Sequence, residues 1–139
     1  MTNTALITGA SSGIGQEFAR YHAQRGGDVI IAARREGALL ALKAELETQY
    51  GIKATVIAQD VGNPDGARAL HTAVEKAGLK IDILINNAGF GGHGNFIERA
   101  LVDDLAMIDL NISSLVTLCH LVGNDMAAQG GGKILNVGS

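Results

Sequence analysis

Short apolar runs, bounded by glycine or by polar residues, recur along this chain of 139 residues. Five such runs fall at residues 4–8, 28–33, 54–58, 81–86 and 133–137. Most are rich in Val and Ile and lack a clean alternation of apolar and polar residues. This pattern is typical of strands that are buried on both faces of a parallel sheet. The sequence therefore predicts five buried strands.

Segments with helical spacing lie between these runs, at residues 13–25, 36–50, 65–77 and 98–128. Strands that alternate with helices favour a doubly wound α/β fold, in which right-handed crossovers connect parallel strands. We therefore expect a Rossmann-type parallel sheet in three α/β/α layers that stops after five strands. No change of composition marks a linker, so residues 1–139 are expected to form one domain.

The last of these helices, at residues 98–128, is expected to be apolar on more than one face. Leu110, Leu118 and Leu121 lie on one face, and a longer stripe with spacings of four and three lies on another. That stripe consists of Leu101, Leu105, Ile108, Ile112, Leu115, Cys119, Val122 and Met126. One side of such a helix would pack on the sheet. Its other side would be covered by a second copy of the chain, forming a homo-oligomer, or by structure that follows residue 139.

Charge and composition make several partner classes unlikely on physical grounds. The net charge is −3, so the chain has no basic field to hold nucleic acid. The apolar stretch at 105–122 contains Asp109, Asn111 and His120 and is expected to fall short of a spanning helix, so no membrane partner is predicted. Cys119 is the single cysteine, and the first residues lack the charged region and cleavage site of a signal peptide. We therefore expect a cytoplasmic protein.

A glycine-rich turn, TGASSGIG at residues 8–15, follows the first predicted strand and opens the first helix. Glycines at such a junction allow a diphosphate to approach backbone N–H groups, and the helix dipole adds a favourable field. The alternative is a tight turn without a ligand. Because the turn lies at the first strand-to-helix junction, where a parallel sheet of this kind binds its ligand, we favour a phosphate site.

Further motifs follow in a fixed order. The glycines have the spacing G-x-x-x-G-x-G, Asp60 and Val61 follow the third strand, and the fourth strand ends in NNAG at residues 86–89. Asn111 lies inside the long helix, and the fifth strand leads to Ser139. Over the whole chain, these motifs resemble the short-chain dehydrogenase/reductase family, of the branch with the shorter chain.

The resemblance implies a role for each matching residue. The diphosphate and the adenosine ribose would be surrounded by Gly9, Ser11, Ser12, Gly13, Ile14 and Gly15. Asp60 and Val61 would flank the adenine, and the ribose on the nicotinamide side would be lined by Asn87, Ala88 and Gly89. Taken singly, Asp60 and the two asparagines are explained as well by ordinary turns.

The end of the second strand indicates which nicotinamide cofactor is bound. An acidic residue there would bind the ribose diol of NAD and repel a 2′-phosphate. This chain has Ala33 at that place, followed by Arg34 and Arg35, and Arg34 is the first choice for the cofactor. Guanidinium groups match phosphate in bidentate geometry, so the sequence predicts NADP, with NAD as the less favoured cofactor. The alternative is a solvated pair at a helix start.

The resemblance also implies a catalytic role for Ser139, which would steady the substrate oxygen, and for Asn111, which would anchor a water. The family's catalytic tyrosine and lysine are expected beyond Ser139. Tyr21 and Tyr50, the two tyrosines of the chain, do not match that position. We therefore expect the cofactor-binding portion of a longer enzyme, cut at its catalytic serine, whose strand at 133–137 forms an aggregation-prone sheet edge.

The predicted function is that of an NADP-dependent oxidoreductase that transfers hydride between the nicotinamide and a carbonyl or secondary alcohol. One alternative is a non-catalytic nucleotide-binding module. Another is a domain of the S-adenosylmethionine-dependent methyltransferase type, which the wide glycine spacing and Arg34 disfavour. No metal site is predicted, because the four histidines show no ligand spacing with one another or with Cys119 and are expected at the surface or in loops.

Overall fold

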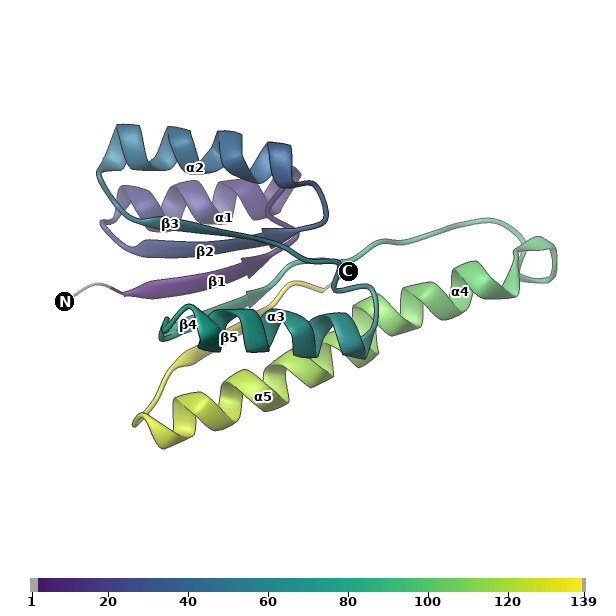
Figure 1. The fold of residues 1–139 in the computed structure, drawn as a ribbon. Coiled ribbons are helices and arrows are strands. Elements are labelled where there is room, and N and C mark those ends of the chain that lie inside the picture. The colour runs from purple at the N-terminus through teal and green to yellow at the C-terminus, as the bar shows by residue number, and fades with distance from the viewer. Residues whose placement is uncertain (1–2, 139) are drawn as a thin grey trace.

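The computed structural model describes residues 3–138, and these residues form one five-stranded parallel sheet (Figure 1). Its strand order is β3-β2-β1-β4-β5, and each neighbouring pair is parallel. The strands are β1 (Thr4–Thr8), β2 (Asp28–Ala33), β3 (Ala54–Ala58), β4 (Ile83–Asn86) and β5 (Lys133–Asn136). The predicted doubly wound α/β sheet is confirmed.

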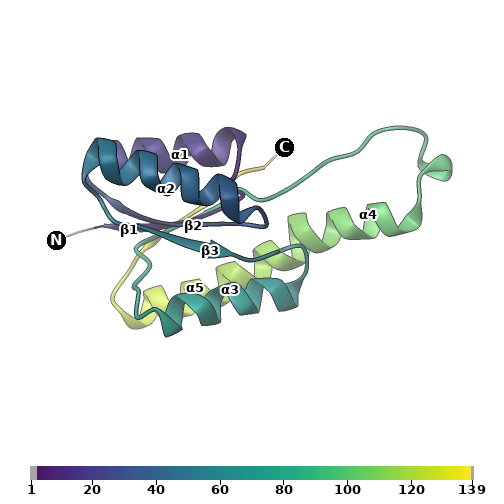
Figure 2. The same cartoon turned by 45° about the horizontal axis from the view of Figure 1, so that its top comes forward.

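Helices cover both faces of this sheet, as Figure 2 shows most plainly. The helices α1 (Gly13–Gln24) and α2 (Glu36–Tyr50) lie on one face. The other face is covered by α3 (Pro64–Lys76) and α5 (Leu115–Ala128), which lie side by side. The three predicted α/β/α layers are therefore present, and the predicted helix bounds are correct to within one residue for α1, α2 and α3.

The two central strands explain why the apolar runs do not alternate with polar residues. Ala5 and Ile7 of β1 point into the core beneath α1 and α2, whereas Leu6, between them, points into the core beneath α3 and α5. The same division holds in β2, where Val29 and Ile31 share the first core. Because side chains alternate between the two faces and both faces are covered, each position of these strands must be apolar.

Local signals in the sequence set the helix ends. Asn63 caps α3 by accepting a hydrogen bond from the Gly66 N–H at 2.9 Å, and Pro64 occupies the first helical position, where no N–H is needed. Gly51 ends α2 in the left-handed region at φ +68°, a conformation that costs glycine little.

The long helix differs from its predicted form. A 3-10 turn, η1 (Phe96–Glu98), precedes α4 (Leu101–Ile108), and a π-helical segment, η2 (Asp109–Ser114), separates α4 from α5 within one continuous helix. A π turn contains an extra residue and therefore rotates the helix that follows it. No such change of register was expected from the spacing of the leucines.

The predicted apolar stripe is correct only in its second half. The buried positions of η2 and α5 are Ser114, Leu118, Val122 and Met126. Leu118 had been assigned to a different face, and the first four members of the stripe are 47–70% exposed: Leu101, Leu105, Ile108 and Ile112. The physical reason is that α4 projects beyond the sheet, where the described residues offer nothing for it to pack on (Figure 1).

The length and apolar character of the long helix also differ from expectation. The helical segment Leu101–Ala128 has 28 residues and is long and apolar enough, by length and composition alone, to cross a membrane. The expectation that it falls short was therefore wrong. A core helix of a soluble protein passes the same test. Leu118, Val122 and Met126 of this helix do belong to the core beneath the sheet. However, 83% of the most apolar window of the helix is not buried inside the structure. The absence of a membrane partner stays a prediction.

The strand β5 lies at the edge of the sheet, beside β4, and all four of its residues are exposed. Ile134 and Leu135 are 40% and 45% exposed. Within residues 3–138 no further strand pairs with it, so the predicted sheet edge is confirmed. Aggregation through this edge stays a prediction.

Candidate functional site

The carboxyl ends of all five strands lie at one edge of the sheet, because every pair is parallel. The chain connects β1 outward to β2 and β3 on one side, and then crosses back to β4 and β5 on the other. A crevice opens at such a switch point, between the ends of β1 and β4, and is where sheets of this type bind ligands.

The backbone at this switch point is packed so closely that only glycine fits. Gly9 has φ +64°, and a Cβ placed on it would lie 2.9 Å from the Cα of Ala88. A Cβ on Gly15 would collide with the carbonyl oxygen of Gly9 and lie 2.7 Å from Asn87 Nδ2. The turn after β1 is therefore pressed against both the segment after β4 and the first turn of α1.

Hydrogen bonds hold the same contact together. The backbone N–H groups of Asn87 and Ala88 both donate to Thr8 Oγ1, each at 3.0 Å. Asn87 Nδ2 donates to the Gly9 carbonyl at 3.3 Å. Sequence reasoning placed Thr8 at the start of the glycine turn but gave it no role. Its available signal was a hydroxyl at the end of a buried apolar strand, where a polar side chain needs a partner.

The N-terminus of α1 is open toward this crevice. Ser12 is its N-cap residue in extended conformation, and its side chain makes no capping hydrogen bond. Gly13 is at φ +54°, and both Gly13 and Ile14 are exposed. The first N–H groups of a helix have no partner within it, and the helix dipole favours an anion there. The turn can therefore accept a phosphate group from solvent.

A guanidinium group lies beside this turn. Arg35, the N-cap residue of α2, donates through Nη2 to Ser11 Oγ at 3.3 Å. Arg34 and Arg35 are both exposed, whereas Ala33 at the end of β2 is buried. The sequence favoured Arg34 as the cofactor-binding arginine. The geometry favours Arg35 instead, because Arg35 reaches the glycine turn, whereas Arg34 makes no hydrogen bond or ion pair within the described residues.

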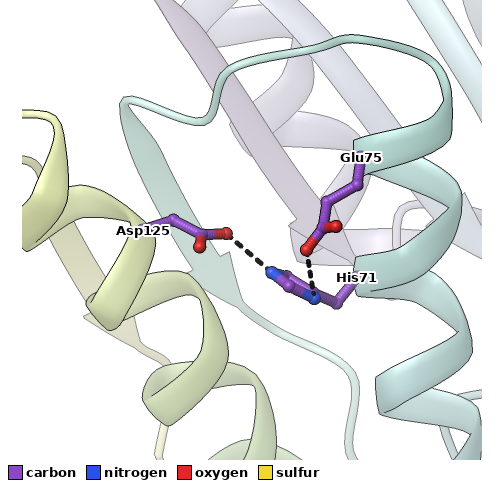
Figure 3. Close-up of side chains that lie close together, drawn as sticks. All are labelled: His71, Glu75 and Asp125. Carbon is purple, nitrogen blue, oxygen red and sulfur yellow. Dashed lines mark hydrogen bonds and ion pairs between the residues drawn. The ribbon is translucent and has the colours of Figure 1, made fainter.

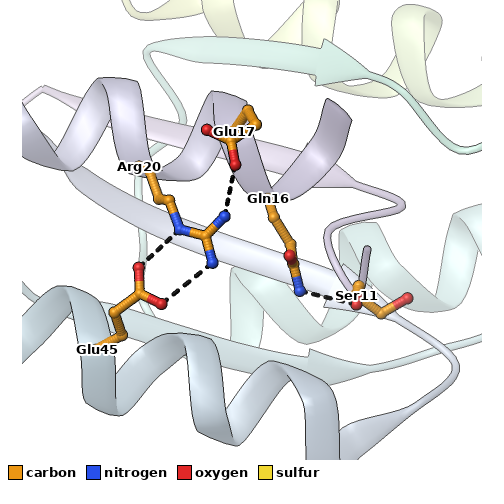
Figure 4. A network of polar contacts seen from close by, with 5 residues as sticks. All are labelled: Ser11, Gln16, Glu17, Arg20 and Glu45. Atoms are coloured by element: carbon orange, nitrogen blue, oxygen red, sulfur yellow. Dashed lines mark hydrogen bonds and ion pairs between the residues drawn. The ribbon is translucent and has the colours of Figure 1, made fainter. Parts of the chain in front are cut away.

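The same turn is braced from the side of α1 (Figure 4). Gln16 Nε2 donates to the Ser11 carbonyl at 3.0 Å. One turn further along α1, Arg20 forms a forked pair with Glu45 of α2, with Nε 2.7 Å from Oε2 and Nη2 3.1 Å from Oε1. Glu17 accepts a third bond from Arg20 at 2.6 Å. The bonds of Arg20 fix α1 against α2.

The ion pairs change the pKa values of the residues that form them. The hydrogen bonds that Arg20 donates, first to Glu45 and then to Glu17, raise the pKa of Arg20 above its ordinary value. In return, the hydrogen bond from Arg20 lowers the pKa of Glu45. The pKa of Glu47 is also lowered, first by the Ala54 N–H and then by Lys43.

Asp60 and Val61 follow β3 at the same edge. Val61 is 7% exposed and belongs to the core beneath α3 and α5. Asp60 is exposed, and its Oδ1 accepts the Gly62 N–H at 2.8 Å, which is the bond of an ordinary turn. Its Oδ2 has no partner within residues 3–138, so one carboxylate oxygen is available to a ligand.

Asn111 lies in the π-helical segment and reaches back to the loop after β4. Its Nδ2 donates to the Phe90 carbonyl at 2.7 Å, and its Oδ1 accepts the Phe90 N–H at 3.1 Å. A Cβ on Gly89 would lie 2.9 Å from Asn111 Oδ1. Both polar ends of this side chain therefore hold the backbone beside Gly89, on the β4 side of the crevice.

A small cavity lies under the crevice, lined by residues from β1, β4 and the long helix, among them Thr8, Asn86, Ala88 and Ser114. Ser114 Oγ is buried there without a hydrogen-bond partner within the described part of the chain. Asn86, also buried, donates to Asn136 Oδ1 at 2.9 Å and to Cys119 Sγ at 3.2 Å, which links the ends of β4 and β5.

Ser139 lies outside the described residues. Neither tyrosine points into the crevice. Tyr21 is exposed on α1, with the Arg25 guanidinium 4.5 Å from its ring centre, and Tyr50 ends α2. The end of α2 leads into β3 and so lies at the opposite edge of the sheet. Neither tyrosine belongs to the site.

A parallel sheet with a glycine turn at its switch point defines a Rossmann-like α/β fold, and solved structures share it. The short-chain dehydrogenase from Sphingobium yanoikuyae in complex with NADPH is 36% identical, with a TM-score of 0.91 over 99% of this chain and 53% of that chain. L-Sorbose reductase from Gluconobacter frateurii, complexed with NADPH and L-sorbose, is 32% identical, with a TM-score of 0.91 over 97% of this chain and 51% of that chain.

The sequence comparisons agree with the fold. The family model for short chain dehydrogenase matches residues 3–139, and the chain belongs to this family. The 7alpha-hydroxysteroid dehydrogenase of Escherichia coli (strain K12) is 36% identical over 136 residues, which is 97% of this chain and 52% of the relative. The chain spans about half the length of the curated relatives it matches. The predicted family resemblance is confirmed.

The forked pair between α1 and α2 should make stability depend on pH. Because Arg20 lowers the pKa of Glu45, the pair stabilises the fold above the ordinary glutamate value of 4.5 and is lost as pH falls through the lowered pKa. We expect Glu45→Gln to reduce the free energy of unfolding at pH 7 by up to about 1 kcal/mol.

Urea unfolding at a series of pH values measures this difference. At pH 3 the variant and the unaltered chain should approach each other, and the double variant with Arg20→Gln should lose less than the sum of the two single variants. A difference that stays the same from pH 7 to pH 3 would show that Glu45 acts through packing rather than charge.

Proposed function

We propose that this chain is the dinucleotide-binding portion of an NADP-dependent oxidoreductase acting on a small carbonyl compound or secondary alcohol. The observation that carries the proposal is the glycine turn at the switch point, with an open helix N-terminus behind it and the Arg35 guanidinium at its rim. Membership of the short chain dehydrogenase family supports it, as do the relatives whose structures contain NADPH.

The residues present fit a dinucleotide phosphate. The backbone of the turn and the first N–H groups of α1 would receive the diphosphate, because Gly9, Gly13 and Gly15 keep side chains away from it. Arg35 would meet a 2′-phosphate beside Ser11. Asp60, through its free Oδ2, would accept from the exocyclic amine of adenine. Asn87, Ala88 and Gly89 would line the opposite ribose.

The nicotinamide supplies or accepts the hydride when bound, and the residues of this chain do the positioning. Asn111 acts as a positioning residue, because its amide holds the Phe90 backbone and thereby fixes Gly89 on the nicotinamide side. Ser139 would donate a hydrogen bond to the substrate oxygen, where negative charge develops in the transition state. The substrate class rests on the family and on two of the relatives named above, L-sorbose reductase and 7alpha-hydroxysteroid dehydrogenase.

Arg35 should decide between the two nicotinamide cofactors. We expect Arg35→Ala to raise the Kd for NADPH by about tenfold or more, because a charged hydrogen bond is lost, and to leave the Kd for NADH unchanged. Fluorescence titration with each cofactor measures this. Arg25→Ala is the matched control, because it removes the same charge at the far end of α1. Tighter binding of NADH than NADPH by the unaltered chain would contradict the NADP proposal.

Asn111 should affect the reaction more than the binding. This chain alone is expected to be inactive, because the family's tyrosine and lysine are expected beyond Ser139. In a full-length version that carries them, we expect Asn111→Ala to lower kcat for NADPH-dependent reduction of a carbonyl panel by up to about 100-fold, because displacement of the nicotinamide-side backbone misaligns the reacting groups. The NADPH Kd should change far less. Asn124→Ala, exposed on α5, is the control. A full-length version that carries the tyrosine and lysine, binds NADPH and reduces none of the panel would favour a non-catalytic nucleotide module.

The exposed side of the long helix supports a homo-oligomer. The apolar side chains gathered there, each about half exposed or more, are Leu101, Val102, Leu105, Ile108, Ile112 and Val116. A surface of this kind marks an interaction site in a soluble protein. We propose that a second copy of the chain covers it.

Light scattering of two variants shows whether the chain associates through this surface or through the sheet edge. We expect Leu105→Lys to lower the measured mass toward the 14.4 kDa of one chain, because a charge would be buried at the interface. Leu135→Lys alters the exposed edge strand instead. If only Leu135→Lys lowers the mass, self-association occurs through β5 and the helix proposal is wrong.

A further inference from the structure

His71 of α3 lies between two carboxylates from two different helices (Figure 3). Its Nδ1 is 3.1 Å from Glu75 Oε1, one turn further along the same helix. Its Nε2 is 2.6 Å from Asp125 Oδ2, which belongs to α5. His71 is therefore not the surface or loop residue that the sequence predicted, since its side chain is only 12% exposed at the contact between the two helices.

The chemistry of this cluster calls for a cation. A neutral imidazole has one N–H, so it can donate to only one of the two carboxylates, and the other then faces a nitrogen lone pair. Glu75 and Asp125 together bring two negative charges to one ring. A proton on the second nitrogen would balance one of them, whereas a divalent metal ion would balance both and bind the lone pair directly.

Space and access favour the metal ion. Glu75 and Asp125 are 60% and 52% exposed, and both border a surface hollow that continues along Gly78–Ile81 to Gln129. Lys80 also borders this hollow, but its Nζ lies 3.7 Å from Asp82, which partly offsets its charge. Solvent therefore reaches the carboxylates, and a bound ion could keep water ligands.

Coordination of one ion requires a side-chain rotation. One donor atom from each of the three residues lies within 4.8 Å of the others. Because Glu75 faces Nδ1 and Asp125 faces Nε2, bonds of about 2.0–2.2 Å to one ion would require one carboxylate to swing to the nitrogen that the other faces. Rotation of Glu75 or Asp125 supplies this movement, because both side chains are largely in solvent. One imidazole nitrogen and two carboxylate oxygens, with a position left for water, is a donor set that suits Zn²⁺.

We propose that His71, Glu75 and Asp125 form a binding site for a divalent transition-metal ion that links α3 to α5. The site lies toward the carboxyl ends of these two helices, which return the chain to the amino-terminal edge of the sheet, away from the cofactor crevice. Its role is therefore to fasten two helices rather than to take part in hydride transfer. No spacing reveals it, because Asp125 is 54 residues from His71.

Thermal unfolding with and without Zn²⁺ tests the proposal. Protein freed of metal with a chelator is compared at pH 7.5 in chelator and in excess Zn²⁺. We expect Zn²⁺ to raise Tm by at least about 3 °C and calorimetry to give one ion per chain. Both effects should be lost in His71→Ala and in Asp125→Asn, the second of which keeps the shape of the side chain and so guards against misfolding.

Asp103→Asn is the matched control, since Asp103 is exposed on the same continuous helix and its side chain has no ion pair within residues 3–138. This variant should respond to Zn²⁺ like the unaltered chain. The proposal is overturned if Zn²⁺ leaves Tm unchanged, or if the shift is as large in Asp125→Asn as in Asp103→Asn.

Discussion

The contact between the backbone after β1 and the backbone after β4 determines the arrangement of the site. Gly9 approaches Ala88 so closely that a single methyl group would separate the two segments, and Gly15 approaches the Gly9 carbonyl in the same way. Thr8 completes the contact by accepting hydrogen bonds from two backbone N–H groups. Because these bonds join the two strands at which the chain reverses its course, the crevice, the open end of α1 and the loop that carries Gly89 are all positioned by one patch of packed backbone.

A second constraint comes from the π-helical segment. It places Asn111 against the Phe90 backbone on one side of the helix and Ser114 under the end of β1 on the other. A π turn is less favourable than α-helix and persists where surrounding contacts require it. Here the required contact is the paired hydrogen bond to Phe90, which extends the order of the sheet into a loop that otherwise has few partners.

The sequence predicted the parts of the fold that depend on local patterns. Apolar runs without alternation identified the buried strands because both faces of the sheet are covered, and helical spacing placed α1, α2 and α3 to within one residue. The register of the long helix could not be predicted, because the extra residue of the π turn leaves no mark on the spacing of leucines. Contacts between distant segments were also invisible. The placement of Arg35 beside Ser11 and the meeting of His71 with Asp125 depend on how the layers stack.

The long helix is exposed to solvent in its first half and packed in the core in its second half, without a break in its hydrogen bonding. From Ser114 onward it contributes Leu118, Val122 and Met126 to the core, so its amides should open to exchange with solvent only when that core unfolds. Before Ser114 it projects beyond the sheet with its apolar side chains exposed, and its amides are protected only by the helix itself. The cooperative unit of the fold therefore ends within a continuous helix, and local opening of α4 can occur while the sheet stays intact.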